Sequence, residues 1–271
     1  MIPKIIHYSW FSGEEMPASF KEMMATWQEH LKDYTFVCWD REALEASGLL
    51  FAKEAAAARK WAFAADAIRV YAVYTQGGIW LDGDVAVYKS FDPFLHHRMF
   101  IGKEHAEEFL LEGCCQHANL LTSHCFGAEK GHPFLKECVD YYRERHFVRS
   151  ENLSLPESLR MDLRPMPLIQ TLLASEMYGY RGSILEVEKE EVLREDIHVY
   201  PARFFDSPKY EGMDDVVCIH FHFHSWTPFN QGRLDLRMLE KPRKKNLTYY
   251  LFKWANRFLA KRGLQIKVMS I

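Results

Sequence analysis

The hydrophobic and polar positions of the first third of the chain follow a strand–helix–strand order. An apolar run, Ile2–Trp10, predicts a first strand, and Pro17–Leu31 carries apolar residues at the spacing of one helix face. A second run, Tyr34–Trp39, predicts a strand parallel to the first, because a helix joins the two. The alanine-rich segment Glu54–Gln76 predicts one long helix that two glycines end. This order predicts an α/β domain.

The rest of the chain predicts shorter elements joined by polar loops. Val85–Tyr88 is expected to continue the strand before it, and a helix is expected from Pro133 to about residue 146. Leu168–Tyr178 predicts another helix. Residues 149–166 are polar and irregular, which predicts a mobile surface loop.

A pair of carboxylates stands directly after a short apolar run, Ile79–Leu81. In an extended segment residues i and i+2 point the same way, so Asp82 and Asp84 are expected to face one point. Gly83 between them would let a ligand approach the backbone. Two adjacent carboxylates repel each other unless a cation lies between them, and oxygen ligands suit Mg²⁺ or Mn²⁺. The motif predicts a divalent metal site, although such a triplet also occurs by chance in loops.

Asp66 and Arg69 stand three residues apart in the alanine-rich helix and share one of its faces. One interpretation is a surface ion pair of small energetic effect. Their neighbours are alanine, isoleucine, valine and aromatic residues, which is unusual for a solvated face. We therefore predict a partly buried pair that faces a ligand.

A second cluster of candidate ligands lies near residue 220, where histidine and phenylalanine alternate. A strand here would place His220, His222 and His224 on one face. Three imidazoles could hold Zn²⁺ for metal-assisted hydrolysis, which is a rival hypothesis to the carboxylate site. The other alternative is that some of these histidines are structural.

Composition bounds the class of protein. With 271 residues, 48% hydrophobic and 26% charged, the chain predicts one elaborated α/β domain with a large core. The six cysteines lack zinc-type spacing and predict reduced thiols. We expect no secretory signal and no transmembrane helix, because no apolar run is long enough, and hence a cytoplasmic location.

The last 31 residues differ in charge from the rest. Residues 241–271 contain nine lysines and arginines and no acidic residue, which leaves −12 for the first 240 residues of a chain with net charge −3. Their aromatic and leucine residues fall on one helical face, which predicts a basic amphipathic helix. Such a helix can lie on the anionic inner face of a membrane or pack on the domain. No nucleic-acid motif accompanies it, so we expect no nucleic-acid partner.

The motifs together resemble a known family. Ala65–Val70 followed by Gly77–Asp84 resembles the DXD signature of glycosyltransferase family 32, which includes yeast-type mannosyltransferases and bacterial capsule and lipopolysaccharide sugar transferases. The catalytic domains of the large clostridial toxins are similar there. The resemblance implies a GT-A-type Rossmann-like sheet, mostly parallel with a mixed edge and flanked by helices. We expect this domain to span residues 1–240, with residues 241–271 as a helical appendage on account of their charge and apolar pattern.

The resemblance also implies roles for single residues. Asp82, Asp84 and His220 would bind the metal, and Arg69 and Asp66 would fix the donor sugar. The residues expected to bind the nucleotide diphosphate are Trp10 against the base, Gly77 and Gly78 in the signature, and Ser225 and Trp226 at the diphosphate. Gln170 is a candidate for the reacting face of the sugar. By analogy with other nucleotide folds, Asp40 could reach a ribose hydroxyl or could simply cap the next helix.

The function that the resemblance implies is metal-dependent transfer of a sugar from a nucleotide-diphosphate donor, with a UDP-sugar favoured. The acceptor would be a saccharide or lipid-linked saccharide, the outcome retention at the anomeric carbon, and the setting surface polysaccharide synthesis. Two other classes stay open. One is a hydrolase or nucleotidyltransferase that acts on nucleotide sugars, and the other is a non-catalytic module that binds them.

Overall fold

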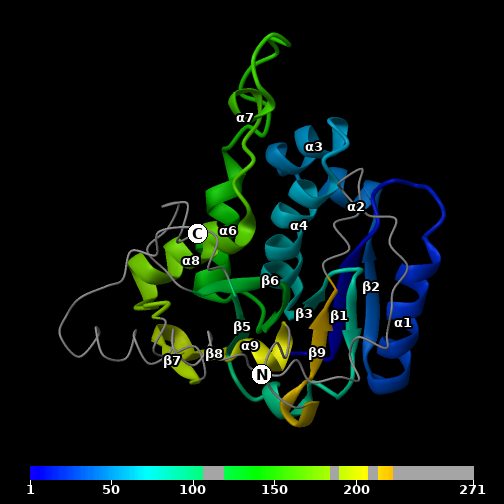
Figure 1. Ribbon diagram of the computed structural model, residues 1–271, viewed down its shortest axis with the longest axis vertical. Helices are drawn as coiled ribbons and strands as arrows, with labels where there is room; N and C mark the ends of the chain where they lie inside the picture. Colours follow the sequence, from blue (N-terminus) through cyan, green and yellow to red (C-terminus); the bar gives the residue numbers. More distant parts are fainter. Residues whose placement is uncertain (106–118, 184–188, 207–212, 222–271) are drawn as a thin grey trace, which may run out of the picture.

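The computed structural model describes residues 1–105, 119–183, 189–206 and 213–221 (Figure 1). Its strands are β1 Ile5–Ser9, β2 Thr35–Trp39, β3 Gly78–Leu81, β4 Val85–Val87, β5 Met99–His105, β6 Asn119–Ala128, β7 Glu191–Leu193, β8 Ile197–Tyr200 and β9 Cys218–His220. Its helices are α1 Ala18–His30, α2 Arg41–Ala46, α3 Leu50–Ala57, α4 Trp61–Gln76, α6 Pro133–Arg143, α7 Glu157–Arg160, α8 Met166–Leu173 and α9 Ala202–Phe205. The predicted appendage 241–271 lies outside the described residues, as do Ser225, Trp226, His222 and His224.

Seven strands form the central sheet in the order β2-β1-β3-β6-β5-β8-β7. β1 pairs in parallel with β2 and β3, and β5 pairs in parallel with β8. β6 is antiparallel to both of its neighbours, β3 and β5, and β7 is antiparallel at the edge. Within this sheet, all strands except β6 and β7 therefore run in one direction. This confirms the predicted α/β class and mixed sheet, and it places one reversed strand inside the sheet as well as one at the edge.

Helices cover both faces of this sheet, and the alternation along β3 shows why. Ile79 and Leu81 pack with α1 in one core cluster, whereas Trp80 packs with α4 in the other. All four residues of β3 are buried, as expected for a strand with helices on both sides. Asp82 stands two residues after Trp80, so its side chain lies on the same face of the sheet, the face that α4 covers.

The long helix predicted for Glu54–Gln76 is wrong in one respect, because two helices replace it. α3 ends at Ala57, Arg59 adopts a left-handed backbone with φ of 57°, and α4 begins at Trp61. The Lys60 amide donates to the Ala55 carbonyl over 2.8 Å and closes the end of α3. No glycine or proline stands at this break, so the alanine-rich pattern predicted a continuous helix across it.

The polar segment 149–166 contains more structure than a loop. The short helix α7 lies within it, and Met161 forms an isolated bridge with Val148, the residue just before the segment. In Figure 1 this segment projects from the domain beside α6.

Candidate metal and donor site

The DXD motif is a turn between two sheets rather than the end of one long strand. β3 ends at Leu81, and β4 starts at Val85 in a separate two-stranded sheet with β9. The Val85 amide donates to the Asp82 carbonyl over 3.1 Å. The prediction that Val85–Tyr88 continues the strand is therefore wrong, and the two carboxylates converge because the backbone turns.

The second sheet brings His220 to this turn. β4 and β9 pair antiparallel with His220 opposite Val85, so the ring lies beside Asp84. His220 Nε2 is 3.2 Å from Asp84 Oδ1, and one ligand atom each of Asp82, Asp84 and His220 lies within 4.8 Å of the others. Residues 136 positions apart in sequence thus form one potential ligand set.

The charge of this set suits a divalent cation. Burial lowers the pKa of His220, but the carboxylates of Asp84, Asp82 and Asp206 outweigh it and raise that pKa to about 9. The protonated ring therefore supplies positive charge where two carboxylates meet. A divalent cation could replace that proton, because carboxylate and neutral imidazole are both metal ligands and metal binding displaces ligand protons.

A buried arginine connects the candidate metal ligands to α4. Arg69 Nη2 is 3.0 Å from Asp66 Oδ1, and its Nη1 is 3.3 Å from Asp82 Oδ2, with the arginine side chain 5% exposed. Burial raises the pKa of Asp66 to about 7 against the attraction of Arg69, and Asp82 adds to the rise. The Trp80 indole donates to Asp82 Oδ1 over 2.7 Å. Arg69 and Trp80 thus both contact Asp82. The Asp66–Arg69 pair is buried and does not lie on a solvated surface.

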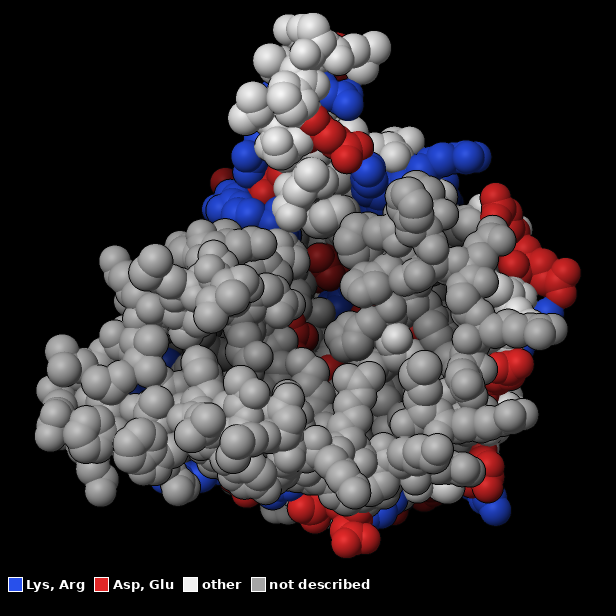
Figure 2. All heavy atoms as spheres, viewed as in Figure 1, with Lys and Arg blue, Asp and Glu red and all other residues white. Residues whose placement is uncertain are grey.

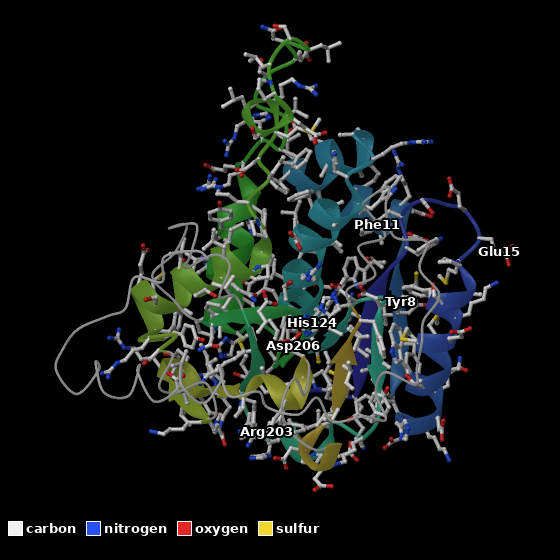
Figure 3. All side chains as sticks on the ribbon, viewed as in Figure 1. Tyr8, Phe11, Glu15, His124, Arg203 and Asp206 are labelled. Atoms are coloured by element: carbon white, nitrogen blue, oxygen red, sulfur yellow. The ribbon has the colours of Figure 1, made fainter. Side chains whose placement is uncertain are left out.

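Two residues beside His220 were not singled out as site residues from the sequence. The His124 ring stacks on the His220 ring at 4.0 Å between centroids, and the His220 amide donates to the Asp206 carbonyl over 2.9 Å. Figure 3 shows His124 and Asp206 close together near the centre of the molecule, and His124 Nε2 lies 3.9 Å from Asp206 Oδ1. Only the pairing of β6 with β3 reveals His124, because nothing in its own segment marks it.

Helix α1 backs the DXD turn. A β-carbon at Gly83 would lie 1.8 Å from the ring of Phe20, which packs there from α1. The Trp27 indole donates to the Val85 carbonyl over 2.7 Å, and the Val87 amide donates to Thr26 Oγ1 over 2.9 Å. The expectation that Gly83 leaves room for a ligand is wrong, because Phe20 occupies that space.

Two of the candidate nucleotide-binding residues follow the ends of β1 and β2. Trp10 is half-buried, its indole donates to the Glu14 carbonyl over 2.6 Å, and its ring is 5.5 Å from that of Phe20. Phe20 therefore connects Trp10 with the DXD turn. Asp40 is exposed and accepts the Ala43 amide over 2.9 Å, so it caps α2.

Gly77 and Gly78 lie at the other end of β3 from the carboxylates. Both have positive φ, 72° and 109°. A β-carbon at Gly78 would lie 2.6 Å from the Ile5 carbonyl oxygen, and one at Gly77 would lie 2.9 Å from the Lys130 amide nitrogen. These contacts explain both glycines by close packing of the chain where α4 turns into β3.

Gln170 is fully buried on α8 and is bound to the central strand. Its amide nitrogen donates to the Leu121 and Thr122 carbonyls over 2.6 and 2.7 Å. The carbonyl oxygen is therefore the atom of this side chain that a ligand could use. The first residue of the same helix contacts the candidate site directly, because the Met166 amide donates to Asp66 Oδ2 over 3.3 Å.

Charged side chains are visible inside one face of the molecule. In Figure 2 acidic and basic atoms appear together in a hollow near the centre of the face shown.

Among the residues that the structure describes, none of the helices combines the length and the hydropathy required to span a bilayer.

Comparisons with known proteins follow this geometry. Residues 17–101 match the model of the glycosyltransferase sugar-binding region containing a DXD motif. The chain is 28% identical over 142 residues to inositol phosphoceramide mannosyltransferase 3 of Schizosaccharomyces pombe, which covers 51% of this chain and 36% of that protein. The chain thus spans about a third of the length of this curated relative.

Solved structures with a similar course of the chain include two glycosyltransferases. The PaToxG glycosyltransferase is 16% identical, with a TM-score of 0.43 over 69% of this chain and 72% of its own. The galactosyltransferase LgtC, in complex with donor and acceptor sugar analogues, is 11% identical, with a TM-score of 0.46 over 91% of this chain and 99% of its own.

The family match and the site occupy the same part of the chain. The matched segment runs from the residue before α1 into β5 and holds Asp66, Arg69, Asp82 and Asp84. Residues 17–101 are therefore similar to the family of glycosyltransferase sugar-binding regions that contain a DXD motif.

Proposed function

We propose that this chain is a metal-dependent glycosyltransferase that moves a sugar from a nucleotide-diphosphate donor to a hydroxyl of a saccharide or lipid-linked saccharide. The observation that carries the proposal is the continuous contact from Asp66 through Arg69 and Asp82 to the group of Asp82, Asp84 and His220. This arrangement joins a potential metal site to a buried guanidinium, and it lies mainly in the segment that matches the family.

The proposed roles follow from the donor atoms. Asp84 and His220 would hold Mn²⁺ or Mg²⁺ directly, and Asp82 would bridge the metal and the ribose or sugar. A bound divalent cation would neutralise the charge that develops on the departing diphosphate. Arg69 and Asp66 would orient the donor sugar, because one guanidinium held between two carboxylates keeps a fixed direction.

The remaining parts of the donor site extend this proposal. Trp10 would stack on the base, with Asp40 near the ribose, and Gln170 would face the reacting side of the sugar through its carbonyl oxygen. Ser225 and Trp226 would contact the diphosphate. We favour a UDP-sugar and retention at the anomeric carbon.

The wider setting is also part of the proposal. Residues 1–240 would form the catalytic domain, and the basic segment 241–271 would touch an anionic membrane from the cytoplasmic side. That location fits a lipid-linked acceptor in the synthesis of a surface polysaccharide. The nine positive charges of this segment support it.

The test is release of free nucleotide from a panel of UDP-, GDP-, ADP- and CMP-sugars with Mn²⁺, with Mg²⁺ and with chelator. We expect metal-dependent release from one donor, faster when the correct saccharide acceptor is added. Rapid release that no acceptor accelerates would instead indicate a hydrolase. Binding of a donor without turnover in the presence of a broad acceptor panel would indicate a binding module.

A further inference from the structure

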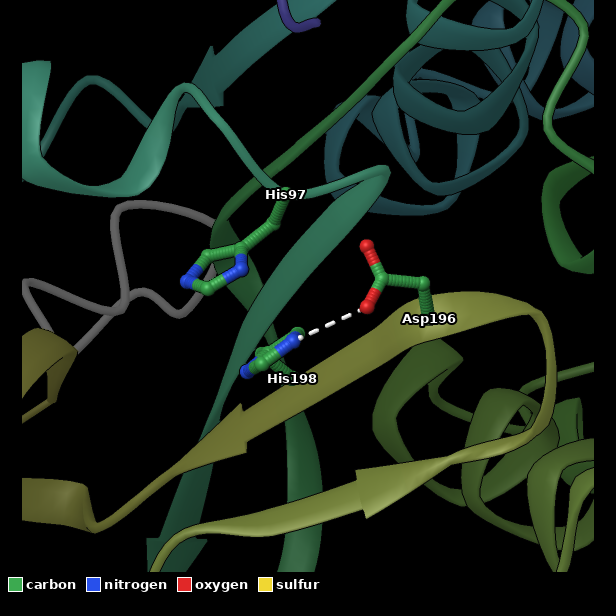
Figure 4. Close-up of side chains that lie close together, drawn as sticks. All are labelled: His97, Asp196 and His198. Carbon is green, nitrogen blue, oxygen red and sulfur yellow. Dashed lines mark hydrogen bonds and ion pairs between the residues drawn. The ribbon is translucent and has the colours of Figure 1, made fainter.

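Three potential metal ligands lie close together at one end of the strands of the sheet, and the DXD turn lies at the other end. His97 precedes β5, Asp196 directly precedes β8 and His198 is the second residue of β8, with one ligand atom of each within 4.8 Å of the others (Figure 4). Ala128 of β6 pairs with the first residues of both β3 and β5, so these two strands begin at the same end of the sheet. Asp82 follows the last residue of β3 and therefore lies at the opposite end.

Each imidazole is oriented by a second partner on its outer nitrogen. His97 Nε2 is 2.9 Å from the Tyr200 hydroxyl, and His198 Nδ1 is 2.7 Å from Glu190 Oε1. The inner nitrogen of His198 lies 3.1 Å from Asp196 Oδ1, and Figure 4 shows a ring nitrogen of His97 turned towards the same place. Metal-binding histidines characteristically donate their other N–H to an oxygen in this way.

Asp196 and the residue before it are held in an unfavourable backbone conformation. Glu195 and Asp196 both have left-handed backbone, with φ of 60° and 56°. The Arg98 amide donates to Asp196 Oδ2 over 2.9 Å, and its guanidinium pairs with Glu195 Oε2 at 2.5 Å. Two consecutive non-glycine residues in this region persist only where the surroundings fix them, and such sites are often functional.

The two imidazoles also contact each other. The rings of His97 and His198 stack at 3.6 Å between centroids, so both lie beside Asp196.

We propose that His97, Asp196 and His198 form a second metal site, for a divalent transition metal of the zinc class, that fastens β5 to β8. Two imidazoles and one carboxylate suit zinc, cobalt or nickel better than Mg²⁺ or Mn²⁺, which prefer oxygen ligands. A bound ion would draw the three ligand atoms from within 4.8 Å to about 3.4 Å apart, the separation of tetrahedral ligands about 2.1 Å from the ion. The site is distinct from the DXD site in both place and ligand chemistry.

The test uses Co²⁺ as a spectroscopic probe on the full chain after chelator treatment. An Asp84→Asn background removes the DXD site, and in it we expect one equivalent of Co²⁺ with the intense visible absorption of low-coordinate cobalt. Adding His198→Gln or Asp196→Asn should remove that equivalent. Asparagine accepts the left-handed backbone at 196, so the second variant keeps the turn folded.

The matched control is His146→Gln, which removes an exposed histidine that pairs with a glutamate elsewhere on the surface. It should leave the cobalt spectrum and stoichiometry unchanged. The proposal is overturned if the Asp84→Asn protein binds no Co²⁺. It is also overturned if His198→Gln and Asp196→Asn, folded by circular dichroism, bind cobalt with the same stoichiometry and spectrum as that background.

Discussion

His220 is the residue whose protonation balances the charge of the DXD turn. Its pKa in the folded protein is about 9, against about 6.5 in an unfolded chain. Because the folded state binds the proton more tightly, the stabilisation is complete below pH about 6.5 and is lost as the pH rises through about 9. The difference in pKa corresponds to about 3 kcal/mol in the free energy of unfolding.

We therefore expect urea unfolding of the metal-stripped protein to show lower stability at pH 9 than at pH 6.5. A His220→Gln variant should show a smaller difference between the two pH values, because its side chain does not titrate. An equal decline in both proteins would mean that other groups, such as Asp66, account for the pH dependence.

Asp84 is the carboxylate whose removal we expect to affect catalysis without affecting folding. It lies in a turn and is partly exposed, so we expect Asp84→Ala to leave the far-ultraviolet circular dichroism unchanged. Donor turnover should fall more than about 100-fold, because a metal contributes several kcal/mol of transition-state stabilisation. Asp33→Asn, which alters an exposed carboxylate paired with Lys4, is the control and should keep full activity. An active Asp84→Ala enzyme would show that this residue is not needed to hold the proposed metal.

At the scale of elements, helix α1 determines the shape of the DXD turn. Phe20 lies against Gly83, and Thr26 and Trp27 bind the backbone of β4. We expect Gly83→Ala to destabilise the protein by about 1–3 kcal/mol, because the new methyl group displaces a ring that packs among Tyr8, Trp10 and Trp27.

A double-mutant cycle tests whether this contact is the cause. Phe20→Ala alone should cost about 3–5 kcal/mol through the cavity that it leaves. In the double variant the alanine at 83 no longer meets a ring, so the combined loss should be smaller than the sum by more than about 1 kcal/mol. Strict additivity, measured by urea unfolding, would show that Gly83 is needed for another reason.

Some elements could be predicted from the sequence and others could not. The βαβ start was predictable, because apolar periodicity changes from strand to helix and back within 40 residues. The break at Arg59 was not, because an arginine in left-handed conformation carries no local signal. The turn into β4 was not either, since Val85–Val87 is as apolar as the strand before it and only its partner β9 distinguishes the two sheets.

At the scale of the molecule, a cation at the DXD turn would join three strands. Its ligands come from the end of β3, the start of β4 and the end of β9. A ligand that binds only the folded state at 100 times its dissociation constant stabilises that state by about 2.7 kcal/mol. We expect Mn²⁺ at such a concentration to raise the melting temperature of the chelator-treated protein, and Asp84→Asn to abolish the rise. A rise of the same size in that variant would place the stabilising ion elsewhere.

The candidate site was predictable where its residues are close in sequence. Asp66, Arg69, Asp82 and Asp84 lie within 19 residues, and their spacing on a helix and after a strand indicated convergence. His220 was placed beside them by resemblance alone, and His124 and Asp206 were not predicted as site residues. Their positions depend on the pairing of β6 with β3 and of β9 with β4, and strand pairing between distant segments is not encoded in any local pattern.

The reversed strand β6 also constrains how the chain can be made. It closes the second side of β3, whose residues are fully buried. A chain that ends near residue 101 contains the whole family segment but leaves that apolar edge open. As the ribosome synthesises the protein, the edge stays open until residue 128 has emerged, and the half-made chain can meanwhile pair with its neighbours. Residues 17–101, which match the family, thus depend on β6 to cover one side of β3.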